Sequence, residues 1–103
     1  MKAELGAAVF TKLLTRFVRE TDDFMTRVNQ NWATDVTTAA AECHKIAGSA
    51  AVFGALAFRT ALITLENAAK DNDPEHAAQV LGTLPDIWKE TRALLSETAS
   101  GEQ

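Results

Sequence analysis

Apolar residues recur at steps of three and four over four separate stretches of this chain, and no other feature limits its fold so strongly. This spacing places them along one side of an α-helix, where they can pack against neighbouring helices. The absence of tyrosine and the scarcity of β-branched runs disfavour a β fold. The sequence therefore predicts an all-α protein built from four amphipathic helices.

The first predicted helix covers about residues 6–31. Charged residues lie mostly off its apolar stripe, as expected for a helix with one face in solvent. A break, or a short extra N-terminal helix near Leu5, is an alternative. The expected buried stripe consists of Phe10, Leu13 or Leu14, Phe17, Thr21, Phe24 and Val28.

The second predicted helix begins at an N-cap, Thr34 or Asp35, and ends at Phe53 with Gly54 as the C′ residue. Because Cys43 falls on its apolar seam, we interpret this residue as a small buried hydrophobe and not as a reactive thiol. The expected seam consists of Val36, Ala39, Cys43, Ile46, Ala50 and Phe53.

The third predicted helix covers about residues 55–71, and Asp73 and Pro74 suit the N-cap and first position of the fourth. The fourth stripe keeps its phase across Pro85, which predicts one helix that is kinked near residues 82–85. The small polar tail, residues 96–103, is expected to fray. The inward positions are Phe58, Ala61 or Leu62, Leu65, and Ala68 or Ala69 in the third helix, and Ala77 or Ala78, Leu81, Leu84, Trp88, Thr91 and Leu95 in the fourth.

Short connections between the four helices predict an up-down-up-down antiparallel four-helix bundle. Residues 1–103 form a single domain in this interpretation, because the sequence shows no internal repeat, low-complexity segment or second unit. A content of 47% hydrophobic residues is enough for a packed core and argues against disorder.

Charge and composition exclude several classes of protein. A net charge of −4 and a pI near 5.0 argue against nucleic acid as the main partner. No apolar run approaches the roughly 20 residues of a membrane span, and the first residues lack a signal-peptide core. The single cysteine fits a reducing compartment. We therefore expect a cytoplasmic monomer that does not enter a membrane.

Few residues in the chain are placed for chemistry. The two histidines, His44 and His76, lie on different predicted helices and lack the Glu-x-x-His spacing of a metal site. Ser49 lies inside a helix and not at a strained nucleophile elbow, and Gly48 and Gly54 do not fit a phosphate-binding loop. We expect no metal and no cofactor, so a metal-binding or hydrolytic protein is the weakest hypothesis. What remains is His44.

Small residues surround His44 on its predicted helix and leave the histidine open to an approaching protein. Its neighbours at one helical turn include Ala40, Ala41 and Gly48. Lys45 flanks the same surface with a cation. The partner-docking surface predicted here consists of Thr37, Ala41, Ala47, Gly48, Ser49 and Ala51.

Glu66 is the predicted partner of His44. His44 lies 9 residues before Phe53 and Glu66 lies 12 residues after Gly54, which places both about 14–18 Å from the helix turn. A carboxylate that accepts the Nδ1–H fixes the ring and leaves Nε2 free as a nucleophile. Lys70, one turn from Glu66, can add positive charge near an incoming phosphoryl group.

Plainer interpretations of these residues stay open at this point. His44 can be an ordinary surface or half-buried histidine. Gly48 can serve the close approach of two helices, and Glu66 with Lys70 can be a routine i,i+4 ion pair. His76 has no evident partner in the sequence.

Three stretches of the chain carry a known pattern: His44-Lys45-Ile46-Ala47-Gly48-Ser49-Ala50, Phe53-Gly54-Ala55 and Leu65-Glu66. With these motifs the chain resembles the histidine-phosphotransfer (HPt) family of bacterial and eukaryotic phosphorelays, over about residues 14–95. The resemblance implies that His44 is phosphorylated at Nε2, that Glu66 bonds the other ring nitrogen, and that Gly48 gives a receiver domain room to approach. Many relatives carry a lysine where this chain has Ala47.

The function that this resemblance implies is phosphorelay. His44 would accept a phosphoryl group from the receiver aspartate of a hybrid sensor histidine kinase and pass it to the aspartate of a response regulator. The chain would be a phosphocarrier and not an enzyme with autokinase activity, and the Mg²⁺ of the reaction would belong to the receiver domain. A second hypothesis, motivated by Ala47, is a non-phosphorylated receiver-docking adaptor or antagonist.

Overall fold

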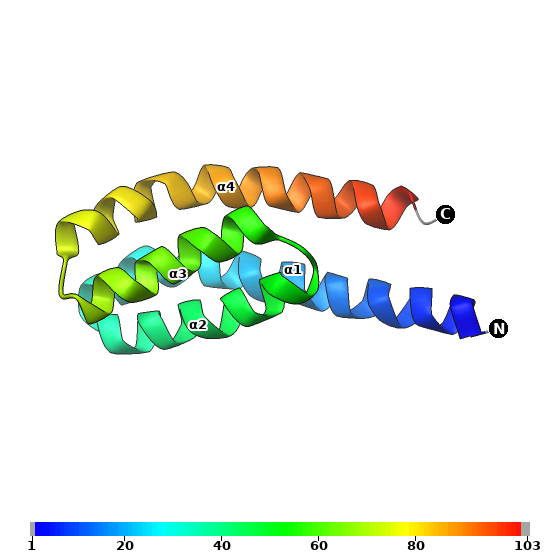
Figure 1. The fold of residues 1–103 in the computed structure, drawn as a ribbon, viewed down its shortest axis with the longest axis horizontal. Coiled ribbons are helices and arrows are strands. Elements are labelled where there is room, and N and C mark those ends of the chain that lie inside the picture. Colours follow the sequence, from blue (N-terminus) through cyan, green and yellow to red (C-terminus); the bar gives the residue numbers. More distant parts are fainter. Residues whose placement is uncertain (1, 102–103) are drawn as a thin grey trace.

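The computed structural model of the chain describes residues 2–101, with side chains from residue 8 to residue 97. It contains helices α1 (Lys2–Thr34), α2 (Val36–Val52), α3 (Leu56–Lys70) and α4 (Pro74–Gly101), and the described residues include no strand. Each helix runs antiparallel to the preceding one, and both termini lie at the same end of a bundle that measures 50 × 21 × 19 Å (Figure 1). The predicted up-down-up-down fold is confirmed.

The first and last helices are longer than the sequence indicated. α1 runs without interruption from Lys2 to Thr34, so the alternative of a break near Leu5 is wrong. α4 continues through Pro85 as one helix, as predicted, and both Leu84 and Trp88 lie on its buried side. It also continues to Gly101, beyond residue 96, where the sequence suggested that the tail begins to fray. The last two residues of the tail lie outside the described residues.

Local hydrogen bonds at both ends fix the limits of α2. Asp35 is its N-cap, and its carboxylate accepts from the Thr38 backbone N–H at 3.2 Å and from the Thr38 hydroxyl at 2.7 Å. These bonds lower the pKa of Asp35. At the other end Gly54 has a φ of 71°, and the Ala55 N–H donates to the Ala50 carbonyl at 2.9 Å. This is a Schellman turn, and Gly54 is the predicted C′ residue.

The connection between α3 and α4 repeats this geometry with asparagine in place of glycine. Asn72 has a φ of 55°, and the Asp73 N–H donates to the Ala68 carbonyl at 2.9 Å. The Asp73 side chain then accepts from the His76 N–H at 3.1 Å, and Pro74 is the first residue of α4. The predicted stop and restart at this position is confirmed.

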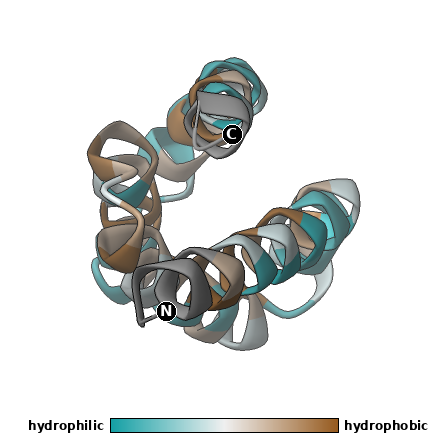
Figure 2. Ribbon diagram, turned by 90° about the vertical axis from the view of Figure 1, so that its right-hand side faces the viewer, coloured by the Kyte–Doolittle hydropathy of each residue, from teal (hydrophilic) through white to brown (hydrophobic). Residues whose placement is uncertain are grey.

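The core forms along the predicted stripes, and the end-on view of Figure 2 shows the helices arranged in an arc around the interior. Leu14 and not Leu13 is the buried member of its pair. Val36 was placed on the seam of α2, but it is 40% exposed because it is the first residue of that helix. The largest fully buried side chains are Thr21, Phe24, Val28, Cys43, Phe58, Leu62, Leu65 and Leu84.

Polar contacts between α1 and α2 show which side of α2 faces α1. Arg27 on α1 bonds the Glu42 carboxylate at 2.7 Å, and the Asn31 amide donates to the same group at 3.3 Å. Glu42 therefore faces α1. His44, two residues later, lies about 200° further around the helix and faces away from α1.

Candidate functional site

His44 stands in the middle of α2 with an exposed ring. Its side chain is 77% exposed, and its Nδ1 lies 3.2 Å from each of the two carboxylate oxygens of Glu66 on α3. The Glu66 side chain is only 15% exposed. The structure therefore brings together the two residues that the sequence paired by their height above the α2–α3 turn.

The contact with Glu66 determines which ring nitrogen of His44 is available. A carboxylate accepts hydrogen bonds, so the hydrogen of the neutral ring lies on Nδ1 and points to Glu66. Nε2 then keeps its lone pair. Because the His44 side chain is largely exposed, this lone pair is accessible to a group that approaches from outside the bundle.

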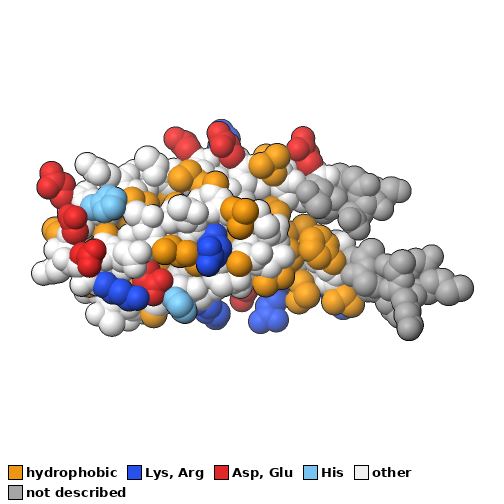
Figure 3. Space-filling view, in the orientation of Figure 1, with side chains coloured by type: hydrophobic (Ala, Val, Ile, Leu, Met, Phe, Trp, Pro, Cys, Tyr) orange, Lys and Arg blue, Asp and Glu red, His pale blue; other side chains and the backbone are white. Residues whose placement is uncertain are grey.

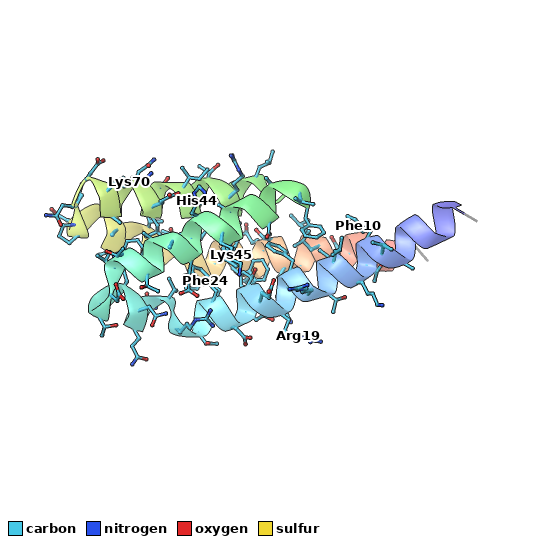
Figure 4. All side chains as sticks on the ribbon, turned by 90° about the horizontal axis from the view of Figure 1, so that it is seen from below. Phe10, Arg19, Phe24, His44, Lys45 and Lys70 are labelled. Carbon is cyan, nitrogen blue, oxygen red and sulfur yellow. The ribbon has the colours of Figure 1, made fainter. Side chains whose placement is uncertain are left out.

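Lys70 extends this pair into a row of three side chains. Its Nζ lies 3.5 Å from Glu66 Oε2, one helical turn along α3, and the lysine side chain is 69% exposed. An exposed i,i+4 pair adds little stability. It does place a cation on the same side of the bundle as His44, as the labels of Figure 4 show.

Lys45 lies about 100° around α2 from His44, on the side that faces α1. It lines a groove between α1 and α2 together with Arg27, Glu42 and Ser49, and neither His44 nor Glu66 lines that groove. Figure 4 shows Lys45 turned toward α1, whereas His44 and Lys70 lie toward α3. Of the two cations that the sequence proposed, the structure brings only Lys70 into contact with Glu66.

Most of the predicted docking surface is exposed, with one error. Thr37, Ala41, Gly48 and Ala51 are exposed, and Ser49 is half-buried. Ala47 is only 4% exposed, so its assignment to the docking surface is wrong. It lies four residues after the buried Cys43 and three before the buried Ala50, which places it on the seam of α2.

Gly48 does not serve the packing of the bundle. A Cβ atom placed on Gly48 meets no heavy atom within 4 Å among the described residues. The alternative in which Gly48 permits close approach of two helices is therefore wrong. The glycine leaves an open strip of surface one turn beyond His44.

Sequence reasoning missed a groove between α2 and α3 that begins at His44 and Glu66. The groove has a volume of about 510 Å³. Val36, Thr37, Ala40 and Ala41 form its α2 wall, and Ala69 and Lys70 form its α3 wall. The α2 residues could have been found in the sequence, because they share one face of a helix. Ala69 of α3 lies opposite that face only because α2 and α3 fold against each other.

Other sources of chemistry are weak in the described residues. Cys43 is fully buried, and burial, with smaller effects of Glu66 and Glu42, raises the pKa of its thiol to about 12. No group of three or more His, Cys, Asp or Glu side chains is placed to hold a metal ion among the side chains described, residues 8–97. Over the same residues, no helix has the length and apolar character needed to cross a membrane.

A comparison with known protein families shows to which family the chain belongs. The sequence model of the Hpt domain matches residues 12–99, which span all four helices. The chain belongs to the Hpt domain family. No curated protein and no solved structure matched the chain. Hpt domains act in histidine phosphotransfer in phosphorelays, where they interact with receiver domains and serve as phosphocarriers. The resemblance found in the sequence is thus confirmed.

Proposed function

We propose that this Hpt domain carries a phosphoryl group on Nε2 of His44 between two receiver domains. The observation that carries the proposal is the exposed imidazole whose Nδ1 is held by Glu66 at 3.2 Å. A fixed ring with one free nitrogen is what transfer to and from an external partner requires. The donor we propose is the receiver domain of a hybrid sensor histidine kinase, and the acceptor is a response regulator.

The transfer step uses only groups that the two partners supply. The Nε2 lone pair attacks the phosphorus of the receiver's aspartyl phosphate, a P–N bond forms, and the P–O bond to the aspartate breaks. The aspartate leaves as a carboxylate. The ring of His44 then carries positive charge, and the Glu66 carboxylate on Nδ1–H stabilises it. In the second transfer the aspartate of the next receiver attacks the phosphorus, and the P–N bond breaks.

Lys70 is the cation that we assign to this site. It lies 3.5 Å from Glu66 on the His44 side of the bundle, whereas Lys45 lines the groove toward α1. Positioning and charge stabilisation dominate phosphoryl transfer, so an exposed lysine on this side of the bundle can support the phosphoryl oxygens. We propose that the chain itself needs no cofactor and that the Mg²⁺ of the reaction belongs to the receiver.

The test is phosphate transfer from a panel of phosphorylated receivers and hybrid kinases. Label should reach this chain, be labile in acid and stable in base, and disappear in a His44→Gln variant. The matched control is His76→Gln, since His76 is also exposed but lies at the start of α4. Label that persists in His44→Gln, or disappears in His76→Gln, would overturn the assignment.

A second function is favoured by one observation. The position three residues after His44, where many relatives carry a lysine, is Ala47 and is enclosed in the core. A receiver-docking adaptor or antagonist that carries no phosphate would not need that cation. It predicts receiver binding without phosphohistidine, and binding that His44→Gln leaves nearly unchanged.

A further inference from the structure

We propose that two copies of this chain form a dimer with twofold symmetry through the end of the bundle where α1 and α4 extend past the α2–α3 turn. Figure 1 shows the N-terminal part of α1 and the C-terminal part of α4 continuing beyond that turn. A dimer at this end replaces the monomer expected from the sequence. It does not depend on phosphate transfer, because His44 lies about 14 Å back along α2 from Phe53 and stays exposed.

The four helices cover one another along only part of the bundle. At 1.5 Å per residue, α2 and α3, with 17 and 15 residues, are about 26 and 22 Å long, whereas α1 and α4, with 33 and 28 residues, are about 50 and 42 Å long. Ring contacts show where the long helices pass the turn. The ring centre of Phe53 lies 5.1 Å from that of Phe17 and 5.5 Å from that of Phe10 on α1. On α4, Trp88 lies 4.9 Å from Phe58, near the start of α3. Beyond these contacts α1 and α4 leave the α2–α3 hairpin behind.

Apolar side chains stay exposed where the long helices leave the hairpin. Of the six large hydrophobic side chains that are exposed among the described residues, five lie at this end of the bundle, and Val36 lies at the other. Figure 3 shows hydrophobic side chains gathered here, over the turn and next to it. A second pair of helices would remove this surface from water, as α2 and α3 do for the rest of the bundle. The five side chains are Val9, Leu13, Val52, Leu56 and Leu94.

Opposite charges on the two long helices make this end complementary to a copy of itself. Lys12 on α1 and Glu97 on α4 are exposed, and neither has an ion-pair partner among the described side chains. They lie at about the same height, because Leu14 and Leu95, each two residues nearer the turn, line one hollow of about 160 Å³ between α1 and α4. In a twofold dimer a surface meets its own copy. Lys12 of one copy can therefore face Glu97 of the other, and the contact occurs twice.

A second copy suits this end better than an unrelated partner whose charge has one sign. Lys12 is the only charged residue in residues 8–13 of α1, and Glu97 is the only one in residues 93–97 of α4. An acidic partner would meet Glu97 and a basic partner would meet Lys12, so each would bring like charges together, which opposes binding. A copy turned by 180° presents the two signs in the reverse order.

Reversing these charges gives a test that only a twofold contact passes. Lys12→Glu alone sets two carboxylates opposite each other, and Glu97→Lys alone sets two ammonium groups opposite each other. A mixture of the two variants forms mixed dimers in which both contacts again join a carboxylate and an ammonium group. The control is Asp86→Lys, which makes the same charge change at another exposed position of α4, about 16 Å from Glu97.

Sedimentation equilibrium of the full chain, from micromolar to millimolar concentration, measures the Kd of the dimer, and circular dichroism checks that each variant is folded. We expect each single reversal to raise the Kd about tenfold or more, and the Kd of the mixed dimer to return to within about threefold of the wild-type value. Asp86→Lys should change the Kd less than about threefold. A wild-type chain that stays monomeric over this range, or a mixture that associates no better than the single variants, would overturn the proposal.

Discussion

Replacing Gly48 tests two of its effects separately: its effect on the stability of α2, and its proposed role in leaving room for a receiver domain. Gly48 is exposed, lies inside a helix, and has open space where a Cβ atom would stand. Glycine in a helix interior costs about 1 kcal/mol relative to alanine. No steric term opposes this gain, so Gly48→Ala should raise the free energy of unfolding by about 1 kcal/mol and the Tm by about 4–8 °C.

A longer side chain at the same position should keep the stability and lose the function. Glutamine is nearly as good a helix former as alanine, so Gly48→Gln should also unfold at higher temperature than the wild type. Its side chain extends into the strip beside His44 that an incoming receiver needs. We expect the rate of transfer from a phosphorylated receiver to fall by about tenfold or more, as misplaced reactants lose a large share of their rate.

The control is Gly82→Gln on α4. Gly82 is exposed and also has no heavy atom within 4 Å of a built Cβ atom. It should gain similar stability and transfer phosphate at the wild-type rate. Urea unfolding, monitored by circular dichroism, measures the stability. Transfer reactions stopped at successive times measure the transfer rate. A loss of stability in Gly48→Ala, or normal transfer in Gly48→Gln, would refute the reasoning.

Three further predictions concern residues of the site and its scaffold. Glu66→Ala should slow transfer about 10- to 100-fold, because it releases the His44 ring. Glu66→Gln should keep most of the wild-type rate, because its amide oxygen still accepts from Nδ1. Equal rates in the two variants would show that Glu66 does not orient the ring. Gly54→Ala should lower the free energy of unfolding by about 1 kcal/mol, because a φ of 71° strains any residue with a Cβ atom; an unchanged urea midpoint would contradict this. Burial raises the pKa of the Cys43 thiol from 9.0 to about 12, so the folded state keeps its proton when the unfolded state loses it. The contribution of this pKa difference to the free energy of unfolding is fully present below pH 9.0. It is lost as the pH rises toward about 12, at up to about 1.4 kcal/mol per pH unit. Urea midpoints across this range should fall more steeply in the wild type than in Cys43→Ala, and parallel curves would show that the thiol titrates normally.

The fold could be predicted because each helix carries its own local signals. The limits of α2 follow from Asp35, which caps its N-terminus, and Gly54, which takes the left-handed conformation after its end. Asp73 and Pro74 start α4 in the same local way. The ends of α1 and α4 were harder to predict, because the residues there carry no strong stop signal and are compatible with a helix.

The pairing of His44 with Glu66 could be predicted because it depends only on helix rise and on the position of the turn. Which helix Lys45 faces could not be predicted in the same way. It depends on which neighbour packs on each side of the α2 seam, and α1 lies on the Lys45 side, where Arg27 contacts Glu42. The burial of Ala47 could have been predicted, because its spacing to Cys43 and Ala50 places it on the seam of α2.

The groove beside His44 is the feature that was least predictable from the sequence. Its α2 wall belongs to one helix face, but Ala69 reaches the opposite wall only when α2 and α3 fold against each other. Alanines at such positions resemble core residues in a sequence, since their small size suits both a packed seam and a shallow surface. The exposed Ala41 lies on the groove face of α2, whereas the buried Ala47 lies on its seam.

The most direct test of the central claim is the position of phosphate on the His44 ring. After phosphorylation of ¹⁵N-histidine-labelled protein by a receiver, ³¹P–¹⁵N NMR identifies the nitrogen that carries the phosphoryl group. The structure predicts phosphate on Nε2 and a hydrogen retained on Nδ1, where Glu66 accepts it. Phosphate on Nδ1 of His44, or on His76, would contradict the account.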